Sequence, residues 1–382
     1  MKLVFRLLLI LGLVAAATSV SVGCLADRLF NNLAPLPIPN QAPPTGLASL
    51  SAESCQPCHT EIYEEWSSSQ MGQSFQNPVF QADWQHQDQF YYCLSCHAPL
   101  EAQQPTLVTG LRGIDPPREI SEPNPVFDAD LQQEGVTCVA CHLKDGALEG
   151  PHEVSAPHPT RFVADFAGAE RCERCHQIVP PPFPFSRSDR PLTDTHAEWK
   201  EWKEVTGKTE TCTDCHMPQV ERSSALGAPV RLGRKHTFPG GWDDDLVRAG
   251  LEVGEVRYTD GRITLPLTNL AGHRFPSGEP ARSLIIAATI FDGAGAKLDE
   301  LETRIERKVK LPVGKELGDN TLAPAEKRLV LIPVSAEYVE KIGRVRVDVL
   351  FDRLANLPVD VNLHGSNTRI KLASRETNGE HR

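Results

Sequence analysis

Five short segments of the chain repeat the pattern Cys-x-x-Cys-His, and the two residues between the cysteines differ each time. They read CQPCH (55–59), CLSCH (93–97), CVACH (138–142), CERCH (172–176) and CTDCH (212–216). Ten of the 11 cysteines lie in these segments, and the remaining one is Cys24. A spacing that is kept while its surroundings change indicates a chemical role for the cysteines and histidines.

Three kinds of site use closely spaced cysteines. A zinc site needs four ligands and usually separates the cysteine pair from its histidines. A redox disulfide uses the two thiols and leaves the adjacent histidine unexplained. Covalent attachment of a c-type haem uses all three residues, because the thiols add to the porphyrin vinyl groups and the imidazole becomes the proximal ligand of the iron.

The pattern therefore predicts five covalently bound c-type haems. The predicted attachment residues are Cys55, Cys58, Cys93, Cys96, Cys138, Cys141, Cys172, Cys175, Cys212 and Cys215. The predicted proximal iron ligands are His59, His97, His142, His176 and His216.

The elements that must position these motifs lie between residues 51 and 245. So few residues per porphyrin leave little room for an aliphatic core, so we expect the macrocycles to form the core of a loop-rich, mainly α domain. Prolines between the motifs, as in 179–184, agree with long loops. Helices are predicted at 60–66, after the first motif, and at 194–199, which opens with Asp194.

The pattern of apolar and turn-forming residues changes after residue 245. Short apolar runs at 255–258, 262–267, 283–291, 327–333 and 344–351 alternate with turn residues, including two Asp-Gly pairs. Such runs predict strands, and Asp-Gly between them predicts hairpins. The fold class is therefore α+β: a pentahaem domain (51–245) followed by an Ig-like β-sandwich (246–373). The polar residues 374–382 are predicted to be a disordered tail.

The N-terminal residues are typical of an export signal and a membrane anchor. Lys2 and Arg6 precede an apolar run, and residues 21–24 read Ser-Val-Gly-Cys, which predicts a lipoprotein signal peptide (1–23) with lipidation at Cys24. An uncleaved membrane helix over 7–26 is the alternative. A proline-rich tether (24–50) should follow. The protein is expected in the periplasm or at the cell surface, held to a membrane.

The chain is acidic, with 39 Lys and Arg residues against 50 Asp and Glu residues and a net charge of −11. This balance argues against nucleic acid as a partner. It agrees with docking onto basic patches of redox proteins, or with solubility alone.

The segment that opens with Cys55 and continues as CxxCHxEIYxxW resembles the multihaem c-type cytochromes related to the tetrahaem cytochrome of ammonia oxidisers. In that group a Trp-x-x-Ser-x-His segment follows the first motif and supplies a haem ligand. Here Met71 stands where that histidine is expected. Further segments resemble distal-ligand segments of the group. The resemblance thus implies the distal ligands Met71, His158, His196, His236 and His273.

These assignments have competitors. His152 is the alternative to His158 in the loop after the third motif, and Met71 could be apolar filling. His86, His364 and His381 are read as surface histidines. Five candidates for five irons favour an electron-transfer protein with both axial positions of each iron filled. The alternatives are a multihaem oxidoreductase of the nitrite, hydroxylamine or sulfite type with one open iron, and a subunit of a larger redox complex or filament.

Overall fold

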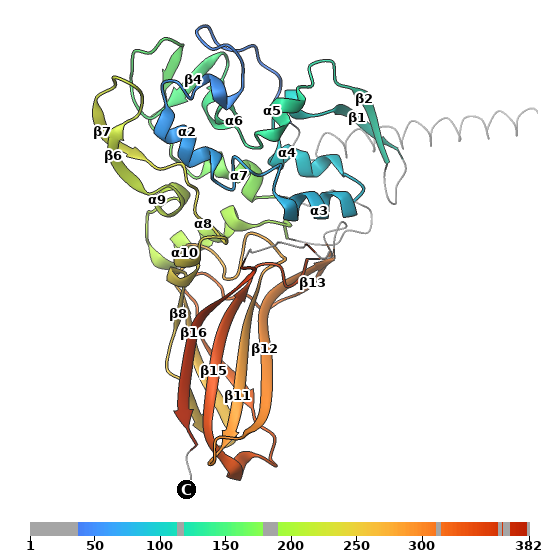
Figure 1. Ribbon diagram of the computed structural model, residues 1–382, viewed down its shortest axis with the longest axis vertical. Helices are drawn as coiled ribbons and strands as arrows, with labels where there is room; N and C mark the ends of the chain where they lie inside the picture. The colour runs from blue at the N-terminus through green and yellow to red at the C-terminus, as the bar shows by residue number, and fades with distance from the viewer. Residues whose placement is uncertain are drawn as a thin grey trace, which may run out of the picture.

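The computed structural model describes residues 37–112, 118–178, 190–310, 315–357, 361 and 367–379. The predicted signal peptide, Cys24, His364 and His381 lie outside these residues. Within the described ranges, no helix is both long enough and apolar enough to cross a membrane. Figure 1 shows the motif-bearing helices and short strands at one end and a group of long strands at the other.

Short helices carry the motifs. The α-helices are α2 (Thr60–Ser67), α3 (Pro78–His86), α4 (Leu94–His97), α5 (Ala129–Gln133), α6 (Cys138–His142), α7 (Glu170–His176), α8 (Thr195–Thr206), α9 (Cys212–His216) and α10 (Asp244–Ala249); 3-10 turns lie at η1 (Ala52–Ser54), η2 (Tyr91–Cys93), η3 (Glu101–Gln103) and η4 (Val339–Lys341). Four motifs form α4 (with Cys93 just before it), α6, α7 and α9, and the first forms turns directly before α2. One helical turn places residues i, i+3 and i+4 on one face, so both cysteines and the histidine of a motif point the same way.

Small sheets and small apolar clusters complete this part. The strands are β1 (Thr106–Arg112) with β2 (Arg118–Pro123), β3 (Leu143–Lys144) with β4 (Ala147–Gly150) and β5 (Thr160–Phe162), and β6 (Gln219–Ser223) with β7 (Val230–Arg234). One cluster of buried apolar residues contains Phe75, Leu94 and Ala98, and another contains Ala169, Trp199 and Trp202. These clusters are too small to organise the five motifs on their own.

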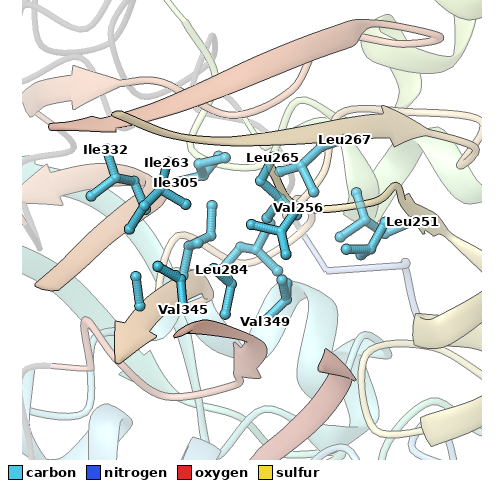
Figure 2. Packing of buried hydrophobic residues seen from close by; sticks show 14 of the residues in the cluster. Leu251, Val256, Ile263, Leu265, Leu267, Leu284, Ile305, Ile332, Val345 and Val349 are labelled. Atoms are coloured by element: carbon cyan, nitrogen blue, oxygen red, sulfur yellow. The ribbon is translucent and has the colours of Figure 1, made fainter. Parts of the chain in front are cut away.

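Two antiparallel sheets enclose the main hydrophobic core. The first contains β14 (Lys327–Pro333), β10 (Arg262–Asn269) and β8 (Leu251–Val253), with β9 (Arg257–Thr259) also paired to β10; the second has the order β13 (Lys315–Asp319), β12 (Lys297–Lys310), β11 (Ser283–Asp292), β15 (Ile342–Asp352) and β16 (Arg369–Asn378). Burial alternates along β10, where Ile263, Leu265 and Leu267 face inward. They meet Leu284 and Val345 of the second sheet (Figure 2).

The predicted hairpin at Asp260-Gly261 is present between β9 and β10. Both turn residues have positive φ, +49° at Asp260 and +70° at Gly261, as a two-residue hairpin turn requires. The expected helices at 60–66 and 194–199 are also confirmed, as α2 and the first part of α8.

Two predictions about flexible segments are wrong. Residues 37–50 of the predicted tether pack on the motif-bearing part: Ile38 donates to Pro99 O and accepts from Glu101 N, and Leu50 is buried. Residues 374–378 of the predicted tail belong to β16, which pairs with β15. Polar composition misled the second prediction, because a strand at the edge of a sheet is held by its backbone and can leave its side chains in water.

Three arginines link the sheets and the motif-bearing part. Arg353, whose side chain is 2% exposed, donates to Gly241 O at 2.7 Å and to the Asp244 carboxylate at 2.5 Å. Arg307 donates to Leu192 O and Pro191 O at 2.9 and 2.8 Å. Arg190 forms ion pairs with Asp319 of β13 and with Glu198 of α8. These bonds fix the orientation of the loops that lead into the sheets.

Candidate haem sites

The motif histidines are oriented by backbone carbonyl groups. The Nδ1 atoms of His59, His97, His142 and His216 lie 2.7, 3.0, 2.8 and 2.6 Å from carbonyl oxygens of Ser224, Ser74, Glu149 and Pro239, respectively. A carbonyl oxygen only accepts, so each Nδ1 carries the hydrogen and each Nε2 keeps a free lone pair. This is the tautomer that a metal-ligating histidine needs.

Two of the predicted distal histidines are held in the same way. Nδ1 of His236 lies 3.1 Å from Arg234 O, and Nδ1 of His273 lies 2.8 Å from Arg274 O. Burial lowers the pKa of His176, His236 and His273 to about 4. At neutral pH these imidazoles are uncharged, which is the form that binds a metal.

Two pairs of proximal and distal candidates lie close together. The ring centres of His142 and His236 are 6.4 Å apart with 25° between the planes, and those of His216 and His273 are 6.4 Å apart with 14° between the planes. With a metal–nitrogen bond of about 2 Å and a ring centre about 1.2 Å behind each nitrogen, imidazoles on opposite sides of one metal place their ring centres about 6.4 Å apart. The residues present therefore fit an iron between the members of each pair.

His196 is held by a side chain. It lies in the first turn of α8 with its own side chain 2% exposed, and its Nδ1 is 3.1 Å from Oε1 of Glu173, inside the fourth motif. Its Nε2 is buried and has no hydrogen-bond partner. A buried nitrogen without a partner is costly unless a ligand occupies it, so His196 also fits an iron.

The structure gives less direct support for the other two predicted distal ligands, His158 and Met71. Nδ1 of His158 is buried and has no partner, whereas the competing His152 is exposed. Met71 is half-buried, and its carbonyl accepts hydrogen bonds from Ser74 N and Val136 N. Its neighbours Gln70 and Gly72 line a cavity of 870 Å³ together with Ser51 and Glu53, just before the first motif. Ligation by Met71 and by His158 stays a prediction.

Cysteines of different motifs touch one another. The thiols of Cys55 and Cys138 lie close enough to perturb each other's pKa, as do those of Cys96 and Cys175 and those of Cys172 and Cys212. The first motif therefore adjoins the third, and the fourth adjoins both the second and the fifth.

Acidic side chains that the sequence analysis did not single out support the histidines. Glu65 of α2 accepts from His236 N at 2.8 Å and pairs with Arg222 at 2.7 Å. Burial acts to raise the pKa of Glu65, but Arg222 and the His236 N–H outweigh it and hold the pKa below its usual value. Glu198 of α8 accepts from Ser277 Oγ and from Arg274 N, on either side of Phe275 and next to His273. Neither glutamate lies in a motif, so no local pattern could have identified them.

Two classes of comparison find no relative: no family model matches the chain, and no curated protein matches its sequence. Among solved structures, the chain is similar to a penta-heme cytochrome c552 from Thermochromatium tepidum, with a TM-score of 0.63 and 19% identity over 88% of this chain and 100% of the other. A calcium-binding mutant of a Bacteroides uniformis beta-glucuronidase matches 34% of this chain and 13% of its own length at a TM-score of 0.16, too low to indicate a shared fold. The chain thus has the fold of the penta-heme cytochrome.

Proposed function

We propose that this protein is an electron-transfer protein that binds five c-type haems covalently. The observation that carries the proposal is the set of five CxxCH motifs whose thiols and imidazole share one face, with the Nδ1 of four motif histidines held by carbonyl groups. The fold shared with a penta-heme cytochrome supports it. Bound haem would supply an iron that alternates between the ferric and ferrous states and so carries one electron.

The chain's own residues would hold both axial positions of the irons. His142 with His236 and His216 with His273 would be two axial pairs, and His196, His158 and Met71 would serve the other motifs. Two protein ligands on an iron leave no open position for a substrate. This favours electron transfer over catalysis.

The contacts between motifs suggest an order in space that differs from the order in the chain. If haems are attached at these cysteines, motifs whose cysteines lie close together would hold neighbouring haems. The pairs formed by Cys55 with Cys138, Cys96 with Cys175 and Cys172 with Cys212 would join the first motif to the third and make the fourth a neighbour of both the second and the fifth. In this arrangement the fourth haem is a branch point.

The remaining parts of the proposal concern location and architecture. The two sheets would form an Ig-like sandwich that carries His273 on the loop between β10 and β11. Lipidation at Cys24 would hold the protein at a membrane in the periplasm or at the cell surface. Its acidic surface would meet basic patches of redox proteins.

Mass spectrometry and electron paramagnetic resonance of the purified protein, made in a host that attaches c-type haem, test the proposal. We expect a mass that includes five haems and ferric signals that are all low-spin. Fewer than five haems would contradict the cofactor count. A high-spin signal in the wild-type protein would favour the oxidoreductase alternative.

A further inference from the structure

The contact between Glu173 and His196 differs from the hydrogen bonds of the other candidate ligands. The Nδ1 bonds described for His59, His97, His142, His216, His236 and His273 go to backbone carbonyl groups. His196 instead meets a carboxylate oxygen at 3.1 Å. A carboxylate carries a full charge, and a hydrogen bond to a charged acceptor is stronger than one to a neutral acceptor.

Such a bond changes the properties of the imidazole. A carboxylate that accepts the hydrogen of Nδ1 draws that hydrogen away from the ring and leaves more electron density on Nε2. A more basic axial ligand favours ferric over ferrous iron, and ligand basicity and nearby charge are two means by which a protein sets a haem potential. The free, buried Nε2 of His196 is the atom that would deliver this effect.

The two residues are held by different elements. Glu173 is on α7, between Cys172 and Cys175, and His196 is in the first turn of α8, which packs on α7. Trp199 lies one turn further along α8, with its ring centre 5.5 Å from that of His196. The imidazole is thus enclosed by protein, whereas the Glu173 side chain is 45% exposed. Water therefore screens part of the carboxylate charge.

Resting on the proposed function, we propose that Glu173 is a positioning residue that fixes the tautomer of His196 and lowers the reduction potential of the one haem that His196 binds. The fourth motif would thereby tune an iron through one of its two variable positions. The fourth motif would then both attach its own haem and adjust the reduction potential of the haem that His196 binds.

The test compares Glu173→Gln with Glu170→Gln in the five-haem protein. Both remove one negative charge from α7, but the glutamine at 173 keeps an oxygen that can accept from Nδ1, and Glu170 is exposed in the first turn. We expect Glu173→Gln to change the ferric/ferrous equilibrium of one haem about tenfold toward ferrous, a rise of about 59 mV for a one-electron couple. Glu170→Gln should leave all midpoints nearly unchanged. Spectroelectrochemical titration measures both.

Two results would overturn the inference. One is an unchanged titration of Glu173→Gln; the other is an equal shift of every haem in both variants, which would indicate a general effect of charge. His196→Ala separates this failure from failure of the proposed ligation. A new high-spin haem in His196→Ala, together with an unmoved Glu173→Gln, would reject the role of Glu173 alone, whereas a fully low-spin His196→Ala would reject His196 as a ligand.

Discussion

The imidazole of His273 lies 6.4 Å from that of His216 with 14° between the ring planes, although His273 belongs to the loop that follows β10. The loop between β10 and β11 is thus the place where the sheets meet the fifth motif. A loop on a rigid sheet is a suitable carrier for one ligand, since its ends cannot move independently. Asn269 reinforces it, because its side-chain amide donates to His273 O at 2.8 Å.

Replacement of His273 by Ala should convert one haem from low-spin to high-spin. The iron would lose one of two axial nitrogen ligands, and water is a weaker ligand than imidazole. Electron paramagnetic resonance and absorption spectra detect the change. His86→Ala is the matched control, because His86 is exposed at the end of α3. If all five haems stay low-spin in His273→Ala, the ligand comes from another residue.

Met71→His should lower the potential of one haem and leave the others nearly unmoved. A thioether favours ferrous iron more than an imidazole does, so a haem ligated by His and Met titrates above bis-histidine haems. Redox titration of the wild-type protein and the variant checks this. Met217→Leu is the control, since Met217 directly follows a proximal histidine. An unaffected titration in Met71→His would show that Met71 is only packing.

Asp319→Asn should weaken the attachment of β13 to the motif-bearing part. The Asp319 carboxylate accepts from Thr321 and pairs with Arg190. Burial acts to raise the pKa of Asp319, but Thr321 and Arg190 outweigh it and lower the pKa below its usual value of 3.8. The charged form therefore stabilises the fold above about pH 4, and this contribution is lost as the pH falls through the lowered pKa.

At pH 7 we expect Asp319→Asn to reduce the free energy of unfolding by about 1 kcal/mol, because water still reaches and partly screens the pair, whose Arg190 side chain is 27% exposed. The difference from the wild-type protein should shrink below about pH 4. Urea unfolding at pH 7 and at pH 3 measures it. Glu300→Gln removes an exposed partner of Lys297 on β12 and should cost less than about 0.5 kcal/mol. A difference that is equal at both pH values would contradict the ion-pair explanation.

Leu265→Ala should reduce the free energy of unfolding of the sheets by about 2–5 kcal/mol, because it leaves a cavity in a closed core. Leu265 is fully buried on β10, whereas Leu329 on the paired strand β14 is 56% exposed. Leu329→Ala is therefore the matched control and should cost much less. Circular dichroism during urea unfolding compares the two. Equal losses would show that the core is not where the structure places it.

How far the sequence predicted the structure depends on the range of the interactions. The helix after the first motif and the strands at 262–267 and 327–333 follow from local patterns, and the structure confirms them. Strand β12 was missed because Glu and Lys interrupt its apolar residues. The contact between Glu173 and His196 could not be predicted, because Glu173 occupies a variable position of a motif and its partner lies on another helix.

Contacts between residues far apart in the sequence also explain why the prediction of a free tether at residues 37–50 was wrong. Their prolines indicate an extended chain, but such a chain can lie on a protein surface as well as in water. Only the surrounding surface decides this. Ile38 is held by Pro99 and Glu101, which follow the second motif.

The position of His273 in the chain has a consequence for biogenesis. The fifth motif precedes the β10–β11 loop in the chain, and on the proposed function haem attachment to its two cysteines would need neither His273 nor the sheets. If His273 is the distal ligand, it would be in place to hold the iron only once the sheets have folded. Folding of the last third of the polypeptide would then be needed before both protein ligands of that iron are in position. A truncated chain would carry its porphyrin but leave that iron reactive toward small molecules.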